Sequence, residues 1–387
     1  MTTDWAHALF RPASAKDIDM SYPENLMPTP LAPLYGEGVV EWMDVFGFAI
    51  PVTWGNPEAE YDAIRNHVAV IEFSMLLKYD LAGPGAADCV NRIFSRDVTA
   101  MKPGRVAYGV VVDLDGHMID DCTVFYHGPE RVMVMGANPR LGEDLQIHAG
   151  PGVQVIERRA EFAQIAVQGP NSRALLQGLT KADLSNVNLP HYSFRTGVEI
   201  AGIPMQISRL GFTGELGYEL LLPTAKTPKL WHALTQAGAS LGLRAVGGAG
   251  LMMARIEAGL IMGGLDYDDT STPWECRMGW AVDLKKSDFQ GKAALVASKA
   301  AAKVTVAAIA FPEGTDGLDG AEVTDQGKVI GAISMAIPSP VLGGKMLAMA
   351  RLDPAHATSG NAVKAAGSVG KVVDLPVHDP ERKRAKS

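Results

Sequence analysis

The chain has 387 residues, of which 47% are hydrophobic and 20% are charged, and its formal net charge is −8 at pH 7. This length exceeds what one ordinary hydrophobic core needs, so it predicts two or three domains, and the composition excludes a disordered chain. The negative charge argues against nucleic acid as a partner, because phosphate binding needs a basic face. One basic cluster lies at residues 382–386, where we expect a solvated chain end.

The cysteines and the apolar stretches exclude several further classes. Cys89, Cys122 and Cys276 are far apart in the sequence, with no CxxC pair and no cluster with histidine. We therefore expect neither a disulfide framework nor a bound metal. Residues 1–5 have no basic stretch followed by an apolar run, and no apolar stretch reaches the length of a membrane span. The expectation is a cytoplasmic protein with no membrane partner and an oligomeric state that the sequence does not indicate.

The predicted elements begin after an irregular lead-in over residues 1–33, which is rich in proline and polar residues. A helix starts at Asn56, because a capping residue is followed by proline and an acid. Tyr61, Ile64, Val68 and Ile71 continue this helix at helical spacing. The strands expected next cover residues 79–82, 106–112, 122–126, 132–135, 164–167, 205–208 and 218–222, with helices opening at 83–85 and running near 175, 231 and 255.

The pattern changes near residue 301. An alanine- and lysine-rich stretch ends there, and short apolar strands separated by Gly- and Asp-rich turns follow. The strands are expected at residues 304–311, 328–335, 346–351 and 372–375. Short strands at this spacing predict a small all-β barrel or sandwich of about 80 residues.

A set of short motifs runs in a fixed order from about residue 40 to the end of the sequence. They occupy residues 104–108, 113–121, 168–170, 210–219, 255–259, 272–275, 288–292, 338–343 and 376–380. Each is weak alone, but together they resemble the aminomethyltransferase family, which is the family of the glycine cleavage T-protein. The resemblance implies an α+β fold, a three-domain ring with folate in its central channel. Residues 34–300 then form two interwoven folate-binding α+β domains, and residues 301–387 form a C-terminal β-barrel.

The resemblance gives Asp121 the central role. It matches the acid beside N5 and N10 of the folate, where a carboxylate can orient the pterin and stabilise positive charge developing on N5. From the residues alone, Asp120 and Asp121 could equally be an acidic turn between strands. If this stretch is extended, the two side chains point to opposite faces, so only one of them faces the ligand.

Further folate-binding residues follow from the same resemblance. Glu219 matches the acid that accepts hydrogen bonds from the pterin amino and amide groups. Tyr108 and Tyr192 match aromatic positions near the folate, where they either stack on the ligand or fill the core. Phe212 and Leu76 complete the candidate set for tetrahydrofolate, and the sequence leaves open whether the basic tail also contacts it.

The chain departs from the family pattern at five positions, and each departure replaces a polar group. Leu251 stands in place of an arginine, Met252 of an aspartate, Met75 of a histidine, Phe212 of a tyrosine and Met135 of an asparagine. Keeping a ligand while losing a buried hydrogen bond to it costs about 1–3 kcal/mol. We therefore expect that the donor side of the pocket has been rebuilt, as in the demethylase branch of the family.

The predicted function is tetrahydrofolate-dependent demethylation, with transfer of a methyl group from a small sulfonium, quaternary ammonium or aryl methyl ether to N5. The alternatives are an aminomethyl or methylene transferase that forms 5,10-methylenetetrahydrofolate, and a non-catalytic folate-binding protein of the same fold. A cationic donor favours aromatic walls, which Trp42, Phe48 and Trp54 could supply. An aryl ether favours a general acid, for which His191 is the candidate. These aromatic residues and His191 could also be purely structural.

Overall fold

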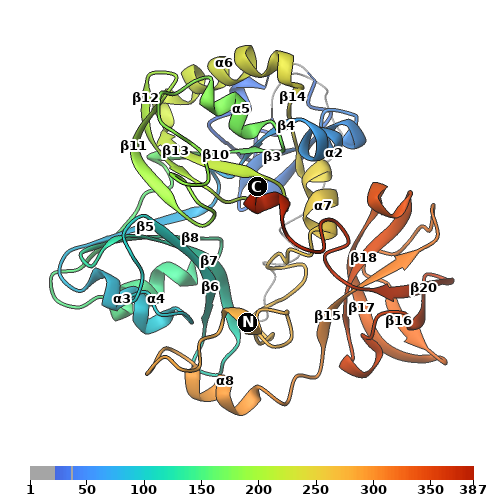
Figure 1. Ribbon diagram of the computed structural model, residues 1–387. Helices are drawn as coiled ribbons and strands as arrows, with labels where there is room; N and C mark the ends of the chain where they lie inside the picture. The colour runs from blue at the N-terminus through green and yellow to red at the C-terminus, as the bar shows by residue number, and fades with distance from the viewer. Residues whose placement is uncertain (1–21, 36–37) are drawn as a thin grey trace.

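The structure is a computed structural model that describes residues 22–35 and 38–387. Most of the lead-in predicted for residues 1–33, including the stretch without a targeting pattern, lies outside the described residues. Figure 1 shows three lobes arranged as a ring around a central opening. The predicted α+β ring with a C-terminal barrel is confirmed. None of the helices among the described residues is long and apolar enough to cross a membrane.

The first lobe is built on a six-stranded sheet in the order β11-β12-β13-β10-β4-β14. Neighbouring strands are antiparallel except for the parallel pair β4 and β14. The strands are β4 (Val68–Glu72), β10 (Phe162–Gln168), β11 (Phe194–Ile200), β12 (Ile203–Ser208), β13 (Gly217–Pro223) and β14 (Leu243–Ala245). The helices of this lobe are α2 (Pro57–Asn66), α5 (Ser172–Gln177), α6 (Thr227–Gly238) and α7 (Gly248–Glu257). A small sheet of β1 (Met27–Pro28), β2 (Glu41–Val45) and β3 (Phe48–Thr53), with the short helix η1 (Ala32–Leu34), precedes them.

The second lobe is inserted between two neighbouring strands of the first. The chain leaves the first sheet after β4, builds a five-stranded antiparallel sheet in the order β6-β7-β8-β5-β9, and returns as β10. The elements are β5 (Leu77–Ala82), α3 (Ala86–Ile93), β6 (Arg105–Val112), β7 (Met118–Gly128), β8 (Arg131–Gly136), α4 (Arg140–His148) and β9 (Gln154–Glu157). The two α+β units are interwoven because of this excursion.

The third lobe is a closed six-stranded barrel. Of the two architectures predicted for the C-terminal region, a barrel or a sandwich, the barrel is therefore the correct one. The connection to it runs through the short helix η4 (Gly279–Ala281) and α8 (Lys292–Ser298). The barrel order is β15-β18-β17-β16-β19-β20. Its strands are β15 (Thr305–Phe311), β16 (Glu322–Asp325), β17 (Lys328–Ser339), β18 (Lys345–Leu352), β19 (Ala362–Ala365) and β20 (Ser368–Val373).

The helix predicted at Asn56 is confirmed, but its predicted length is wrong. The Asn56 side chain accepts a hydrogen bond from the backbone N of Ala59 at 2.9 Å, as an N-cap does. The helix ends at Asn66, and Val68 and Ile71 lie instead in strand β4. Every residue of β4 is buried, and its apolar run Val-Ala-Val-Ile suits a strand enclosed on both faces. Apolar spacing alone did not separate that strand from one more helical turn.

The basic tail is also more ordered than predicted. The Arg384 guanidinium contacts the buried Glu215 carboxylate at 2.7 Å and donates to the carbonyl of Arg65. The buried Arg209 donates to the carbonyl of Ala385 at 2.9 Å. These contacts tie the last described residues across the ring to the first lobe, so the tail is not a free solvated end.

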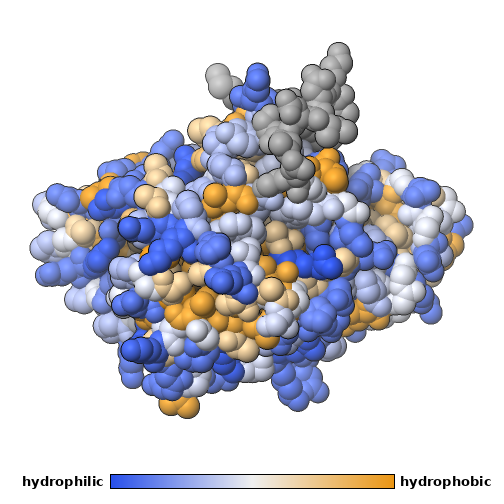
Figure 2. Space-filling model, turned by 90° about the horizontal axis from the view of Figure 1, so that it is seen from above, coloured by the Kyte–Doolittle hydropathy of each residue, from blue (hydrophilic) through white to orange (hydrophobic). Residues whose placement is uncertain are grey.

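The surface in Figure 2 shows the mixture of hydrophilic and hydrophobic residues that is ordinary for a folded protein.

Candidate active site

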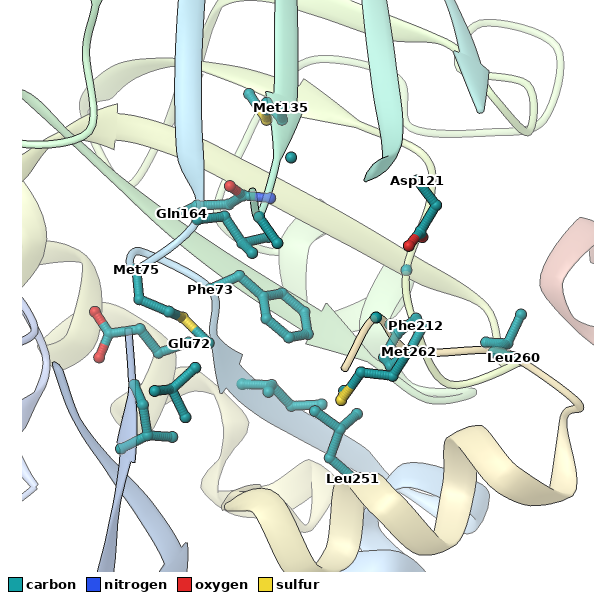
Figure 3. Close-up of a pocket in the computed structure, with 18 of the residues that line it drawn as sticks. Glu72, Phe73, Met75, Asp121, Met135, Gln164, Phe212, Leu251, Leu260 and Met262 are labelled. Atoms are coloured by element: carbon teal, nitrogen blue, oxygen red, sulfur yellow. The ribbon is translucent and has the colours of Figure 1, made fainter. Parts of the chain in front are cut away.

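A cavity of about 260 Å³ lies between the two α+β units. Strands β2, β3, β4, β10 and β13 and helix α7 bound it on one side, and strands β6 to β8 bound it on the other. Residues 210–212, 260–263 and Tyr267 also line it. Figure 3 shows Asp121 across the cavity from Glu72, with Phe73 between them. The site is therefore formed by segments that are distant in the sequence.

Asp121 is held between two tyrosines. It stands on β7, opposite Val110 of β6, and its Oδ2 accepts a hydrogen bond from the Tyr108 hydroxyl at 2.6 Å. The Tyr267 hydroxyl donates to Oδ1 and accepts from the Asp121 backbone N at 3.1 Å. Burial raises the pKa of Asp121, and the two phenol hydrogen bonds act in the opposite direction. Both carboxylate oxygens thus have a fixed donor.

Asp120 turns away from these phenols. Its Oδ2 accepts from the backbone N of Ala137 at 2.7 Å and of Asn138 at 3.0 Å. Burial, followed by the charge of Asp121, raises the pKa of Asp120 well above its usual range. The neighbours point in opposite directions, as the alternation along a strand predicts. Asp120 fixes the end of β8, and Asp121 is available to the cavity.

Glu219 forms a second polar point of the cavity, on β13. Gln164 donates from Nε2 to Glu219 Oε2 at 2.8 Å. Burial raises the pKa of Glu219 to about 7, while Gln164 and the charge of Lys78 act to lower it. Lys78 is fully buried and donates to the carbonyls of Ser74 at 3.2 Å and Leu76 at 2.8 Å. The Lys78 ammonium therefore fixes the turn that presents Leu76 to the cavity.

Glu72 anchors the N-terminal segment at the far wall. Its carboxylate accepts from the Thr29 hydroxyl at 2.5 Å, the Leu31 backbone N at 3.2 Å and the Tyr35 hydroxyl at 3.3 Å. Burial raises its pKa, and these hydrogen bonds oppose the rise.

Among the described residues, no group of three or more His, Cys, Asp or Glu side chains is arranged to hold a metal ion.

Comparison with known proteins decides the family. Residues 35–286 match the family model described as the GCVT N-terminal domain. The aminomethyltransferase of Halothermothrix orenii is 30% identical over 358 residues, which is 90% of this chain and 99% of that protein. The chain belongs to the aminomethyltransferase family.

Other members give the same result. The aminomethyltransferase of Streptomyces coelicolor is 34% identical over 354 residues, or 88% of this chain and 94% of that protein. The trimethylamine-oxide aldolase of Ruegeria pomeroyi is 32% identical over 373 residues, which is 91% of this chain but 47% of that protein. The crystal structure of the glycine cleavage system aminomethyltransferase T of Bartonella henselae superposes with a TM-score of 0.82 at 24% identity, covering 91% of this chain and 98% of that one. This last match shows the shared fold.

The five positions predicted from the sequence to depart from the family pattern all line one cavity. They are Met75, Met135, Phe212, Leu251 and Met252. The described lining residues include the acids Glu72, Asp120, Asp121 and Glu219 but no lysine, arginine or histidine. The wall is therefore apolar with acidic points, and no cationic side chain among the described residues faces it.

The candidate folate-binding residues meet in this cavity, but the candidate donor-binding residues lie outside its lining. Tyr108, Tyr192, Phe212, Leu76 and Glu219 line it together with Asp121. Trp42 and Trp54 instead pack around Tyr35, with ring centroids 6.5 and 5.1 Å away. Phe48 lies under the Arg159 guanidinium at 5.3 Å. They were candidates because they are aromatic residues of the N-terminal segment, and these rings pack on other side chains.

His191 also lies outside the cavity lining. Its ring packs edge-on against Tyr192 at 4.6 Å. Burial, with the nearby positive charges of Arg209, Lys386 and Arg105, lowers its pKa to about 4. The imidazole is therefore neutral near pH 7, and an acid that has already lost its proton cannot protonate a leaving group there.

Tyr267, Gln164 and Lys78 were missed by sequence reasoning. Tyr267 lies 146 positions from Asp121 and outside the motifs. Gln164 was assigned only to a strand, and Lys78 precedes another. A polar residue in an apolar strand was the available signal for Gln164 and Lys78, because such a group needs a buried partner. Nothing in the local sequence of Tyr267 indicated its role.

Proposed function

We propose that this protein is a tetrahydrofolate-dependent transferase that moves a methyl group from a small cationic donor to N5 of tetrahydrofolate. The observation that carries the proposal is the cavity lining, in which carboxylates occur without any lysine, arginine or histidine among the described residues. A bound cation favours the charged form of these buried carboxyl groups and gains from it, whereas an anionic donor would find no counterion among the described lining residues.

The acceptors at Glu219 support folate as the acceptor of the carbon. Gln164 Oε1 is buried with no hydrogen-bond partner among the described residues, and the neighbouring Glu219 carboxylate has one donor, Gln164 itself. Such acceptors fit the amino and amide N–H groups of a pterin edge. Leu76, Phe212 and Tyr192 supply flat or apolar surface beside them.

Asp121 is the proposed catalytic residue. Bound tetrahydrofolate supplies the nucleophile: the N5 lone pair forms the new N–CH₃ bond as the donor C–S or C–N bond breaks and its electron pair stays on the leaving atom. Asp121, fixed by Tyr108 and Tyr267, stabilises the positive charge that develops on N5 and accepts the proton that N5 loses.

A sulfonium or quaternary ammonium donor fits these residues better than an aryl methyl ether. The cation leaves as a neutral molecule and needs no acid, while a phenolate leaving group benefits from one. The cavity has no histidine among its described lining residues, and His191 lies outside it with its pKa lowered to about 4. Aromatic rings for cation–π contact are supplied by Tyr35, Phe46 and Phe73.

The test is to incubate the protein with tetrahydrofolate and a panel of methylated sulfonium, ammonium and methoxyaryl compounds, and to separate the folate products chromatographically. We expect 5-methyltetrahydrofolate from a cationic donor. Formation of only 5,10-methylenetetrahydrofolate would establish the second candidate, an aminomethyl or methylene transferase. That candidate is favoured by the names of relatives that are 30–34% identical. Folate binding without either product would support the non-catalytic alternative.

A further inference from the structure

The loop that carries Tyr267 contacts the barrel through the residue before Tyr267 and the residue after it. Asp266 accepts a hydrogen bond at Oδ1 from the Ser334 hydroxyl of β17, at 2.8 Å. Asp268 contacts the Arg351 guanidinium of β18 at 2.9 Å. Tyr267 stands between these two acids. The barrel supplies no lining residue of the cavity among the described residues, so it can act on Asp121 only through neighbouring segments such as this loop.

A bulge in the barrel strand supports a specific role for Ser334. The pairing of β17 with β18 shifts register between Ile333 and Met335, which leaves Ser334 as the extra residue. A β-bulge re-aims a side chain and is costly to keep without a purpose. Here the hydroxyl oxygen lies 2.8 Å from Asp266 Oδ1 and 3.1 Å from the carbonyl oxygen of Met349, and its single hydrogen points to the nearer, charged acceptor.

Asp266 is itself rigidly held. Its side chain and that of Arg255 are fully buried and form an ion pair, and its Oδ2 also accepts from the Met262 backbone N at 2.9 Å. The backbone of Tyr267 accepts from Gly264 N at 2.8 Å. A β-carbon at Gly263 would lie 2.9 Å from the Tyr267 hydroxyl oxygen, so the phenol packs directly over this glycine.

The second contact, between Asp268 and Arg351, is an ion pair at neutral pH. Although burial acts to raise it, hydrogen bonds from Thr270 and Ser271 and the Arg351 charge lower the pKa of Asp268 to about 2. The Arg351 and Asp268 side chains are 28% and 37% exposed, so solvent weakens the attraction between them. The Ser334 hydrogen bond is partly buried, and its acceptor Asp266 is fully buried. Together the two contacts restrain the Asp266–Asp268 loop from both ends.

We propose that the barrel positions the catalytic carboxylate: Ser334 and Arg351 fix the loop of Tyr267, and Tyr267 fixes the orientation of Asp121. The inference rests on the proposed function for its kinetic consequences only. Tyr267 and the two barrel residues act as positioning residues, since a displacement of the order of 1 Å at a reacting group costs about 100-fold in rate.

The test compares Ser334→Ala, Arg351→Met, the double variant and Tyr267→Phe with wild type. Ser368→Ala and Lys371→Met, on barrel strand β20, are the matched controls. We expect the double variant to lower kcat about 10-fold and Tyr267→Phe about 50-fold, with the dissociation constant of tetrahydrofolate unchanged within about twofold. The controls keep wild-type turnover.

A second readout needs no activity. In ligand-free protein with ¹³C-labelled aspartate carboxyls, the Asp121 resonance is identified by its loss in Asp121→Asn and titrated with pH. The titratable groups facing Asp121 are Tyr108, Tyr267, Asp120, Asp266, Cys122 and Cys276. Losing the Tyr267 hydrogen bond removes an effect that lowers the pKa of Asp121, so its titration moves to higher pH in Tyr267→Phe and, by a smaller amount, in the double variant.

The outcomes separate the two proposals. If wild type makes no methylated folate, the proposed function fails, and the carboxyl titration alone judges the positioning inference. A double variant with wild-type turnover and wild-type Asp121 titration overturns the inference, whatever the folate product is. Should the double variant not fold, Arg351→Met, which breaks a partly exposed contact, and Tyr267→Phe carry the same test.

Discussion

Glu219 should make the free protein less stable at neutral and higher pH. Burial raises its pKa from 4.5 to about 7 in the ligand-free cavity. At about 1.36 kcal/mol for each pKa unit, this corresponds to roughly 3 kcal/mol. Because the folded-state pKa is the higher one, the stabilising contribution is complete below pH 4.5 and is lost as the pH rises through 7. Replacing Glu219 by glutamine, which has a similar shape but no charge, removes this loss of folding stability.

The perturbation is therefore Glu219→Gln, with the exposed Glu199→Gln on β11 as its control. Urea denaturation at pH 5 and pH 8 gives the free energy of unfolding of each variant. We expect Glu219→Gln to match wild type at pH 5 within about 1 kcal/mol and to be more stable at pH 8 by up to about 3 kcal/mol. Loss of the attraction between Glu219 and Lys78 reduces the gain but does not reverse its direction.

The same substitution should weaken folate binding. A hydrogen bond to a charged group contributes about 1.5–3 kcal/mol, so the dissociation constant of tetrahydrofolate should rise roughly 10- to 100-fold at pH 8. Calorimetric titration of both variants measures it. The reasoning is refuted if the variant is less stable than wild type at pH 8, or if its stability difference is the same at both pH values.

Three further predictions concern the cavity. Asp121→Asn should lower kcat about 100-fold or more, while the dissociation constant of tetrahydrofolate stays within about threefold of wild type. Single-turnover kinetics measure the rate, and calorimetry measures the binding. Full turnover by this variant would contradict the mechanism. Leu251→Arg puts a cation into the lining and should raise the KM of a cationic donor about 10-fold or more, whereas Leu251→Met should not. His191→Phe should keep kcat within about twofold at pH 7, because this imidazole lies outside the cavity; a large loss of kcat in a folded variant would assign it a role in the reaction.

The fold could be predicted further than the site. The motifs in their fixed order carried the family resemblance, and that resemblance implied a ring with a C-terminal barrel. The boundary between helix and strand was not predicted correctly, because Val68 and Ile71 fit both a helical and a strand pattern. The packing that buries both faces of β4 comes from segments that are distant in the sequence.

The site could be predicted only where a residue belongs to a motif. Asp121, Tyr108 and Glu219 do, and they meet in the cavity. Tyr267 does not, and its hydrogen bond to Asp121 joins residues 146 positions apart in the sequence. The donor-binding candidates Trp42 and Trp54 were chosen for their aromatic character, and the structure places them outside the cavity lining, where both pack against Tyr35. Composition indicates which rings are available, and only packing decides which of them line a cavity.

The central claim is transfer of an intact methyl group to folate under the control of Asp121. It is tested most directly with a sulfonium or quaternary ammonium donor that carries a CD₃ group, followed by mass spectrometry of the folate product. The account predicts 5-methyltetrahydrofolate that retains all three deuterium atoms, formed by wild type and lost in Asp121→Asn. A methylenetetrahydrofolate product with two deuterium atoms, or equal product from Asp121→Asn, would contradict it.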